Sequence, residues 1–386
     1  MDSGRDSSRG VGDGDSTGVG GFVIGTMRGI LPENRCRSVG REQEQPMSAK
    51  QAGKTTRQGF DKELAELDAL SEALKSNAAP DAAQVEQLRK ALAYRNNFLA
   101  TKAARMVADA ELFALLPEVL AAFDRFFIDG AKSDPQCWAK NALVKALVKL
   151  EHCEKDAYLR GLRCHQMEPA MGGASDSAGA LRGACAHALV DCPGISDADL
   201  LVLLLEPLTD SDKTVRIEAA RAIGQVGGAS AALILRLRAL LGKDEPEVLG
   251  ACYSALLAVE GARAIELVAA VLKEGDDLAA EAAFALAEMR TPQALAALQQ
   301  RLRAGADAWF GSVLLSAIAL TRLPEALDYL IALIARDARE APSALEAIGR
   351  SAPTPELRSR VEQAVEQTGS QRLEQAFCRH LPARPE

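Results

Sequence analysis

The sequence predicts an all-α protein built as an α-solenoid of stacked helical hairpins. Hydrophobic residues make up 48% of the chain but aromatic residues only 4%. Much of the apolar content is Ala and Leu, which suits closely packed helices better than sheets. Apolar residues recur at helical spacings of three and four, and a longer pattern repeats at steps of 42, 34, 33, 30 and 31 residues. Repetition at this period is typical of a solenoid.

Length and charge narrow the possible functions. The chain has 386 residues and a formal net charge of -8, which makes it mildly acidic, whereas dedicated nucleic-acid binders usually carry a strongly basic face. Eight cysteines without regular spacing do not form the dense disulfide framework of a small secreted domain, so we expect reduced thiols and a cytoplasmic protein. The longest apolar runs, 200–205 and 312–320, fall far short of the roughly 20 residues that cross a bilayer. No membrane span is expected.

The composition divides the chain into four parts. Residues 1–46 are rich in Gly, Ser, Asp and Arg, cannot bury enough apolar surface to fold, and are expected to be disordered. Met47 opens a different composition, which raises the hypothesis that translation starts there; N-terminal sequencing of natively expressed protein would test it. Residues 47–94 are expected to form a helical cap, with Asp81 and Gln84 as a capping box. The repeat array covers residues 95–365, and 366–386 form a C-terminal helix and tail.

The clearest repeat unit is DSDKTVRIEAARAIGQVGG, residues 210–228, followed by a second apolar helix, AALILRLRALLG, residues 231–242. With Val215 as position zero, positions four, seven, eight and eleven should face the core. Position zero falls on Ala139, Leu181, Val215, Val248, Leu278 and Trp309. Position seven carries a small residue each time, namely Ala146, Ala188, Ala222, Ala255, Ala285 and Ser316. Small residues there let neighbouring helices approach closely.

Cysteine and histidine residues are concentrated between Cys137 and Cys192. The register places Cys185 at position four and Cys192 at position eleven, nearly two helical turns apart, which is too far for two ligands of one zinc ion. Both are predicted to be small core residues, with His187 at the edge of the buried face. Cys153, Cys164 and His165 are not explained by the register, so a metal or redox site in this region stays open. We predict no metal and no cofactor.

The unit at 210–228 resembles the HEAT-like repeat family, in the short form also found in phycobilin lyases, through Asp212, Val215, Arg216, Ala219, Ala220, Ala222, Ile223, Gly224 and Gly227. The resemblance implies a right-handed, armadillo-type superhelix whose second helices line a concave surface that holds a protein partner. It also implies that Asp212 caps its helix and that Arg216 joins a polar ladder between repeats. Leu249 and Ala279 stand where the ladder expects arginine.

Two candidate binding sites stand out. The step from Ala139 to Leu181 is about ten residues longer than the others, and the excess forms a loop, residues 160–183, of the kind that often carries function. Its candidate binding residues are Arg163, His165, Gln166, Glu168, Asp176 and Arg182. Alternatively, this is an Ω-like loop that satisfies its own charges and caps the next helix through Asp176 or Ser177. The second candidate is Arg236 with Arg238, which could face an acidic partner or lie on a solvated helix edge.

The leading interpretation is a non-enzymatic, monomeric scaffold that binds a segment of a protein partner on a rigid helical surface. An accessory or lyase-like enzyme with a ligand site in the 160–183 loop is the alternative, and nucleic-acid binding is the third. No catalytic residue is predicted. None of the four histidines is followed by glutamate, which argues against the di-iron chemistry of HEAT-repeat deoxyhypusine hydroxylases.

Overall fold

The computed structural model describes the backbone of residues 49–74 and 80–382, with side chains from residue 59 onward. The expected disordered tail, 1–46, and the alternative start at Met47 lie outside these ranges. Residues 56–386 form one contact unit, to which all the packing below belongs. Within the described residues, 20 α-helices form a single succession of helical hairpins, so the predicted all-α repeat fold is confirmed.

Each hairpin has a first and a second helix. The first helices are α3 (Asn97–Asp109), α6 (Trp138–Lys149), α8 (Gly179–Val190), α10 (Lys213–Val226), α12 (Pro246–Glu260), α14 (Asp277–Glu288), α16 (Ala308–Leu320), α18 (Ala341–Arg350) and α20 (Gln371–His380). The second helices are α4 (Leu116–Arg125), α7 (Lys155–Leu162), α9 (Asp197–Leu208), α11 (Gly228–Leu241), α13 (Ala262–Val271), α15 (Pro292–Arg303), α17 (Pro324–Ala335) and α19 (Pro355–Thr368). The remaining elements are α1 (Ala49–Leu74), α2 (Ala82–Leu92), α5 (Gly130–Ser133), two 3₁₀ turns (Phe113–Leu115 and Pro135–Cys137) and strands β1 (Met167–Ala170) and β2 (Gly173–Asp176).

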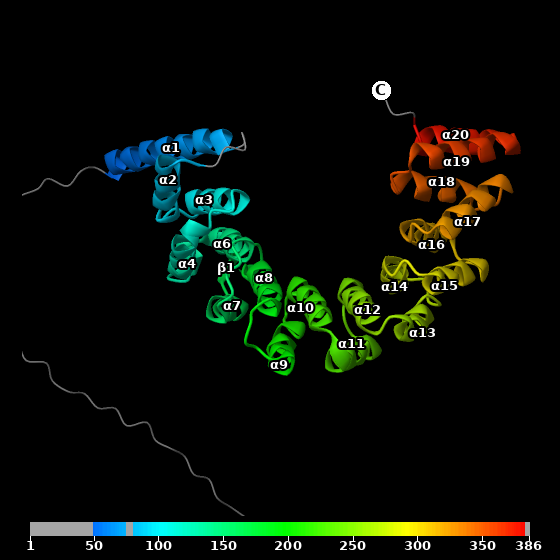
Figure 1. Ribbon diagram of the computed structural model, residues 1–386, viewed down its shortest axis with the longest axis horizontal. Coiled ribbons are helices and arrows are strands. Elements are labelled where there is room, and N and C mark those ends of the chain that lie inside the picture. Colours follow the sequence, from blue (N-terminus) through cyan, green and yellow to red (C-terminus); the bar gives the residue numbers. More distant parts are fainter. Residues whose placement is uncertain (1–48, 75–79, 383–386) are drawn as a thin grey trace, which may run out of the picture. The chain divides into compact units, whose positions relative to one another are not determined.

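The hairpins stack so that the first helices form one layer and the second helices another (Figure 1). Neighbouring first helices pack directly on one another, as α8, α10, α12 and α14 do, and each second helix also packs on the next first helix, as α11 does on α12. Neighbouring second helices α9, α11 and α13 pack more loosely. The resemblance implied that the second helices line the concave side. Here the first helices pack more closely on one another, as the helices on the inner side of a local bend must. The first helices α8 to α14 therefore lie on that inner side.

Helix starts follow the chemistry expected from the sequence. The Asp81 carboxylate accepts a hydrogen bond from Gln84 N, and the Gln84 side chain accepts one from Asp81 N, so the predicted capping box is confirmed. Asp212 accepts from Thr214 N at 2.8 Å, which confirms the cap that the resemblance implied. Asp276 and Asp307 cap α14 and α16 in the same way. An aspartate therefore caps three of the first helices, α10, α14 and α16.

The repeat register is correct for most of the array. Position zero is fully buried in α6, α8, α10 and α12, and the small residues of position seven are buried in every repeat except that of Ser316. Trp309 is the error: its side chain is 49% exposed, and the adjacent Phe310 is fully buried instead. The reason is that a first helix contacts two neighbours and a second-layer helix, so it buries a wider face than the template assumed. Among the described residues, none of the helices is long and apolar enough to cross a membrane.

Candidate functional site

The segment expected to be a loop, 160–183, contains an antiparallel β-hairpin. Strand β1 pairs with β2 from Met167 opposite Asp176 to Ala170 opposite Gly173, with a turn at Met171 and Gly172. Gly172 has a φ of 95°, a conformation that side chains disfavour and glycine adopts freely. The strand sequences MEPA and GASD lack the β-branched and aromatic residues that mark strands, so the hairpin could not be predicted from them.

Polar contacts hold the base of this hairpin to the array. Gln166 is buried; its side-chain nitrogen donates to Asp134 O (2.9 Å) and to Glu168 Oε1 (2.6 Å), and its oxygen accepts from Lys140 Nζ (2.9 Å). Glu168 also accepts from Gln136 N (2.7 Å) and from the Ser177 hydroxyl (2.8 Å). Every one of these groups is therefore engaged within the chain. This arrangement matches the alternative expectation, a loop that satisfies its own charges.

Asp176 links the hairpin to the next first helix. Its carboxylate accepts from Gln166 N (2.9 Å), Ala178 N (3.0 Å) and the Arg182 guanidinium (2.6 Å), and it lies 3.0 Å from His165 Nδ1. Burial alone would raise the pKa of Asp176, but these hydrogen bonds outweigh it and hold that pKa well below its usual range. Ala178 is the N-cap residue of α8 and has no capping side chain, and the Asp176 carboxylate binds Ala178 N rather than an amide of the first turn, so neither Asp176 nor Ser177 caps α8 in the predicted way.

A ladder of buried cations runs along three successive first helices. Position one carries Lys140, Arg182 and Arg216. The fully buried Lys140 ammonium lies 3.1 Å from the equally buried Asp134 carboxylate. Arg182 bridges Asp176 to Asp210 of the next hairpin, which it binds through Nε (2.8 Å) and Nη2 (3.0 Å).

Arg216 continues the ladder by binding Asp244 (2.9 Å) and the Asp210 carbonyl (2.7 Å). Leu249 fills the next position, so the ladder ends at α12, where the sequence departs from the family pattern. The ladder thus exists over three hairpins, and sequence analysis missed Lys140 and Arg182 as its members. The signal was available, because both are basic residues at the same repeat position as Arg216.

The remaining candidate residues are dispersed. Arg236 forms an ion pair with Glu260, and Arg238 forms one with Asp244, so both guanidiniums are already engaged on the second layer. Arg163 is exposed at the end of α7 and lines a shallow depression with His165. The structure therefore brings His165, Gln166, Glu168, Asp176 and Arg182 together but leaves Arg163, Arg236 and Arg238 outside that group. Binding at any of these residues stays a prediction.

The cysteines behave as the register predicts. Cys185 and Cys192 are buried, and burial raises the pKa of both thiols, that of Cys192 to about 11. The pKa of Cys252, at position four of its repeat, is raised by burial to about 12. Thiols with such pKa values stay protonated at neutral pH and act as small apolar side chains. In the part of the chain that the structure describes, no three His, Cys, Asp or Glu side chains are grouped as metal ligands would be.

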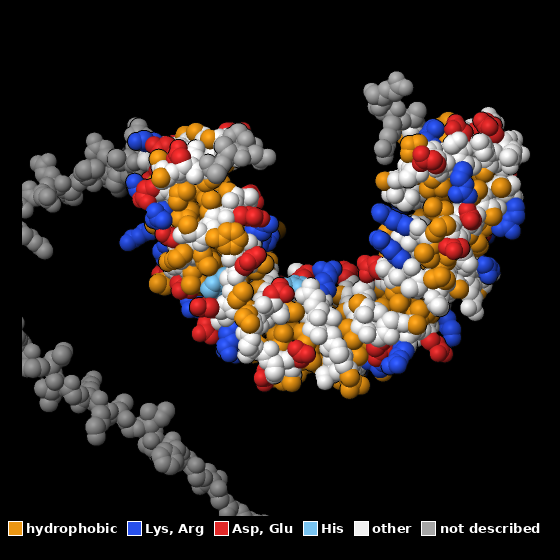
Figure 2. Space-filling view, in the orientation of Figure 1, with side chains coloured by type: hydrophobic (Ala, Val, Ile, Leu, Met, Phe, Trp, Pro, Cys, Tyr) orange, Lys and Arg blue, Asp and Glu red, His pale blue; other side chains and the backbone are white. Residues whose placement is uncertain are grey.

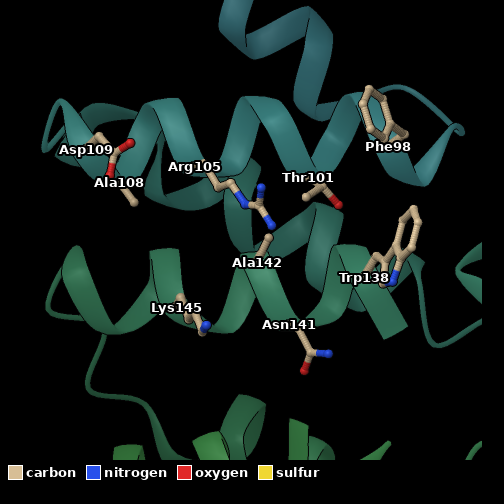
Figure 3. Close-up of a pocket in the computed structure, with 9 residues that line it drawn as sticks. All are labelled: Phe98, Thr101, Arg105, Ala108, Asp109, Trp138, Asn141, Ala142 and Lys145. Carbon is tan, nitrogen blue, oxygen red and sulfur yellow. The ribbon is translucent and has the colours of Figure 1, made fainter. Parts of the chain in front are cut away.

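Sequence analysis did not find a groove that lies between first helices α3 and α6. It encloses about 500 Å³ and is lined from α3 by Phe98, Thr101, Arg105, Ala108 and Asp109, and from α6 by Trp138, Asn141, Ala142 and Lys145. Figure 3 shows the two aromatic rings at one end, Asp109 at the other, and Thr101 and Arg105 reaching from α3 toward α6. These residues recur at spacings of three and four along each helix, so each helix presents one face to the groove.

Two polar atoms of the groove have no hydrogen-bond partner among the described residues. The Thr101 side chain is buried, with only 7% of the residue exposed, and its hydroxyl oxygen is unpaired in this structure. The Asn141 side-chain oxygen is also buried without a partner. A buried polar atom without a partner costs about 1–3 kcal/mol relative to a paired one, so each atom favours a ligand that supplies a donor. The floor of the groove is thus incomplete as the chain stands.

The two cations of the groove also have no partner among the described residues, and its two aromatic rings are exposed. Arg105 and Lys145 are exposed, and neither has an ion-pair partner among the described residues. Phe98 and Trp138 are exposed, and one side of the Phe98 ring contacts the Phe60 ring, with 6.3 Å between the ring centroids. An exposed pair of rings beside two free cations combines apolar contact area with attraction for an anionic group. This part of the first layer can therefore bind an acidic ligand that carries an apolar side chain.

The interface between α8 and α10, further along the same layer, shows what a closed first-layer surface is like. His187 Nε2 lies 2.6 Å from Glu218, its Nδ1 lies 3.2 Å from Gln225, and Arg221 binds Glu218 at 2.7 Å. These side chains bridge the two helices, and Glu218 also occupies the space above Gly183. No such bridge joins α3 to α6 at the groove among the described residues, which is why that interface remains open.

Comparison with known proteins assigns the central hairpins. A family model for HEAT repeats matches residues 201–279, from within α9 to the start of α14. Over these residues the chain is similar to HEAT repeats. Among solved structures, a crystal structure described as an engineered protein, a Northeast Structural Genomics Consortium target, is 17% identical, with a TM-score of 0.32, over 84% of this chain and 96% of that one. Comparison with curated proteins gave no match.

Proposed function

We propose that this chain is a non-enzymatic scaffold that binds an acidic, extended segment of a partner protein in the groove between α3 and α6. HEAT-repeat domains are typically protein-binding scaffolds, which supports the class of function. The observation that carries the specific site is the buried, unpaired Thr101 hydroxyl at the floor of an open groove. Native interiors rarely leave such a group without a partner, so a ligand is its natural completion.

The groove chemistry defines the segment. A main-chain N–H or side-chain amide of the partner donates to Asn141 Oδ1, and a polar group pairs with the Thr101 hydroxyl. A carboxylate of the partner lies between Arg105 and Lys145, and an apolar side chain packs between Phe98 and Trp138. An extended peptide offers these groups at alternating positions, because successive side chains of a strand point to opposite sides. The 500 Å³ volume accommodates a few residues rather than a folded domain.

A rigid framework makes this binding efficient. The walls of the groove are helices whose buried faces are packed in the continuous core, so they lose little conformational entropy when a segment binds. The enzyme alternative depends on the 160–183 segment and on the finer likeness to phycobilin lyases. Gln166, Glu168, Asp176 and Arg182 there are engaged in holding the hairpin and the ladder, so we favour the scaffold.

The test is selection from a phage-displayed library of random 12-residue peptides on the immobilised full chain. We expect enriched peptides to contain Asp or Glu near an aromatic or aliphatic residue. Reversing one cation, Arg105→Glu, should weaken their binding by about tenfold or more, since a charge-assisted hydrogen bond contributes about 1.5–3 kcal/mol. Trp138→Ala should also weaken binding through lost contact area.

Arg221→Glu is the matched control, because Arg221 is an exposed arginine on the first-layer helix α10, outside the groove. Peptides that bind Arg105→Glu as well as the natural chain, or a selection that enriches no acidic motif, would refute the proposal. Binding to the groove should quench the fluorescence of Trp138, one of two tryptophans, and a Trp309→Phe background isolates that signal.

A further inference from the structure

The outward face of second-layer helix α11 is apolar. Leu233, Leu237, Leu240 and Leu241 are 68%, 61%, 68% and 54% exposed. A helix on the surface of a protein normally turns polar side chains to solvent and apolar ones to the core. Helix α11 buries Ala231, Leu235 and Ala239 against the core and also exposes leucine on its other side.

The apolar surface continues onto the neighbouring helix α9, where Val202 and Leu205 are exposed. Figure 2 shows hydrophobic side chains at the surface over α9 and α11, along the lower edge of the view. Among the described second-layer helices that follow, α13, α15 and α17 expose no large hydrophobic side chain and present residues such as Glu266, Gln300 and Asp328 instead. The apolar face therefore belongs to α9 and α11 and not to second-layer helices in general.

The sequence of α11 is self-complementary about Leu237. Residues 233–241 read LILRLRALL, so Leu233 and Leu241 lie four residues to either side of Leu237, and arginines stand one residue to either side. In a pair of identical antiparallel helices related by a two-fold axis, Leu237 meets Leu237 of the second copy and Leu233 meets Leu241. A symmetric interface needs a surface that complements itself in this way.

The charges near this face permit such pairing. Arg236 is neutralised by Glu260 and Arg238 by Asp244 within the same chain, so two copies do not bring unpaired like charges together. The six exposed side chains offer about 300–400 Å² of apolar area on each copy. With the polar rim that accompanies such a core, two copies bury roughly 1,000–1,300 Å² in total, which reaches the lower range of specific protein interfaces.

We infer that the α9–α11 face is a homodimer interface in which α11 packs antiparallel against α11 of a second copy, centred on Leu237. The sequence alone favoured a monomer, because it does not reveal which leucines of LILRLRALL face solvent. The face is apolar and its neighbouring arginines are already paired within the chain, so it offers no free charge to a charged partner surface. Its two-fold character favours a second copy over an unrelated helix.

The first experiment measures the mass of the full chain by light scattering during size-exclusion chromatography at concentrations up to about 100 µM, where an interface near the lower size limit should be occupied. We expect twice the 40.9 kDa of the chain. Leu237→Asp should reduce the mass to that of one chain, because it buries a charge at the two-fold axis. Val148→Asp is the matched control, since Val148 is an exposed apolar residue on α6, and it should remain dimeric.

A second experiment tests the geometry directly. Leu237→Cys places one thiol opposite its symmetry mate, so mild oxidation should join two chains by a disulfide that a reductant cleaves. Val148→Cys should not give this product. A monomeric natural chain at 100 µM, a dimeric Leu237→Asp variant, or no cross-link in Leu237→Cys would each overturn the inference. A monomer that binds phosphatidylglycerol vesicles through Leu237 would overturn it in favour of a membrane surface.

Discussion

Arg182 gives the sharpest test of the cation ladder, through the substitution Arg182→Met. The buried guanidinium donates to Asp210 through Nε (2.8 Å) and Nη2 (3.0 Å), and to Asp176 (2.6 Å) and the Cys164 carbonyl (2.9 Å) through Nη1. Methionine keeps most of the apolar stem but removes the charge. The carboxylates of Asp176 and Asp210 then lose their shared cation.

The expected loss is about 3 kcal/mol in the free energy of unfolding at pH 7. Removing one partner of a buried ion pair usually costs about 3–5 kcal/mol. The lower end applies because both carboxylates keep main-chain partners: Asp210 accepts from Asp212 N at 2.8 Å, and Asp176 accepts from Gln166 N and Ala178 N. Arg221→Met is the control, because Arg221 is an exposed arginine in a surface pair whose loss should change stability by less than about 1 kcal/mol.

The pH dependence adds a second measurable consequence. The pKa of Asp176 is lowered in the folded chain, so its contribution to stability is present above the unfolded pKa and is lost as pH falls through the folded pKa. Without Arg182 that pKa is lowered less, and the variant has less of this stabilisation to lose. The difference in stability between the natural chain and Arg182→Met should therefore narrow as pH falls below about 4.

The assay combines urea unfolding, followed by circular dichroism, with amide hydrogen exchange in α8. Both are needed because repeat arrays can unfold in parts, and a single global free energy then conceals a local change. A loss below 1 kcal/mol at pH 7, together with unchanged exchange in α8, would refute the stabilising role of the ladder. So would a difference between the two chains that stays constant from pH 7 to pH 3.

Three further changes test the packing. Ala222→Asp places an unpaired charge in a fully buried site between neighbouring first helices, so it should lower the free energy of unfolding by several kcal/mol and lower the midpoint of thermal unfolding. An unchanged midpoint would contradict the register. Burial raises the pKa of Cys252 to about 12, so iodoacetamide at pH 8 should label Cys252 far more slowly than the exposed Cys153. Site-resolved mass spectrometry measures the two labelling rates, and equal rates would show that α12 opens readily. In Gly161→Ala the new methyl group would overlap the Cys185 sulfur and should lower the free energy of unfolding by about 1–3 kcal/mol. Adding Cys185→Ala to the same chain should restore that stability. No loss of stability in Gly161→Ala alone would show that the contact between α7 and α8 is looser.

The helical repeat could be predicted because burial in a stacked hairpin imposes a regular period on the sequence. Cys185 illustrates this: its chemistry suggested a metal or thiol site, but its position in the period placed it in the core, where it lies. Trp309 shows the limit. Apolar periodicity locates the buried face of a helix only to within one residue. Because helix α16 is apolar almost throughout, its sequence does not show whether Trp309 or Phe310 faces the core.

The β-hairpin and the groove depend on information that no local pattern contains. The hairpin is held by Gln166 and Glu168 through contacts with Asp134 and Gln136, which lie 32 residues earlier in the sequence. The groove is open because, among the described residues, no pair of polar side chains bridges α3 and α6 there. Such an absence, between two helices about 40 residues apart in the sequence, leaves no motif. Trp138 was a weak sign of the groove in the sequence, because it stands just outside the predicted core face in a chain with few aromatic residues.

The two proposed surfaces are mutually compatible because they use different layers of the array. The groove is formed by first helices α3 and α6, whereas the dimer face is on second-layer helices α9 and α11. A dimer would therefore carry two open grooves, and a partner with two acidic segments could occupy both. The second segment then binds at a high effective concentration, which increases overall affinity without any new contact. Leu237→Asp should accordingly leave the affinity for a single peptide unchanged but weaken binding of a tandem peptide, whereas Arg105→Glu should weaken both. That pair of results would separate the role of the groove from the role of the dimer.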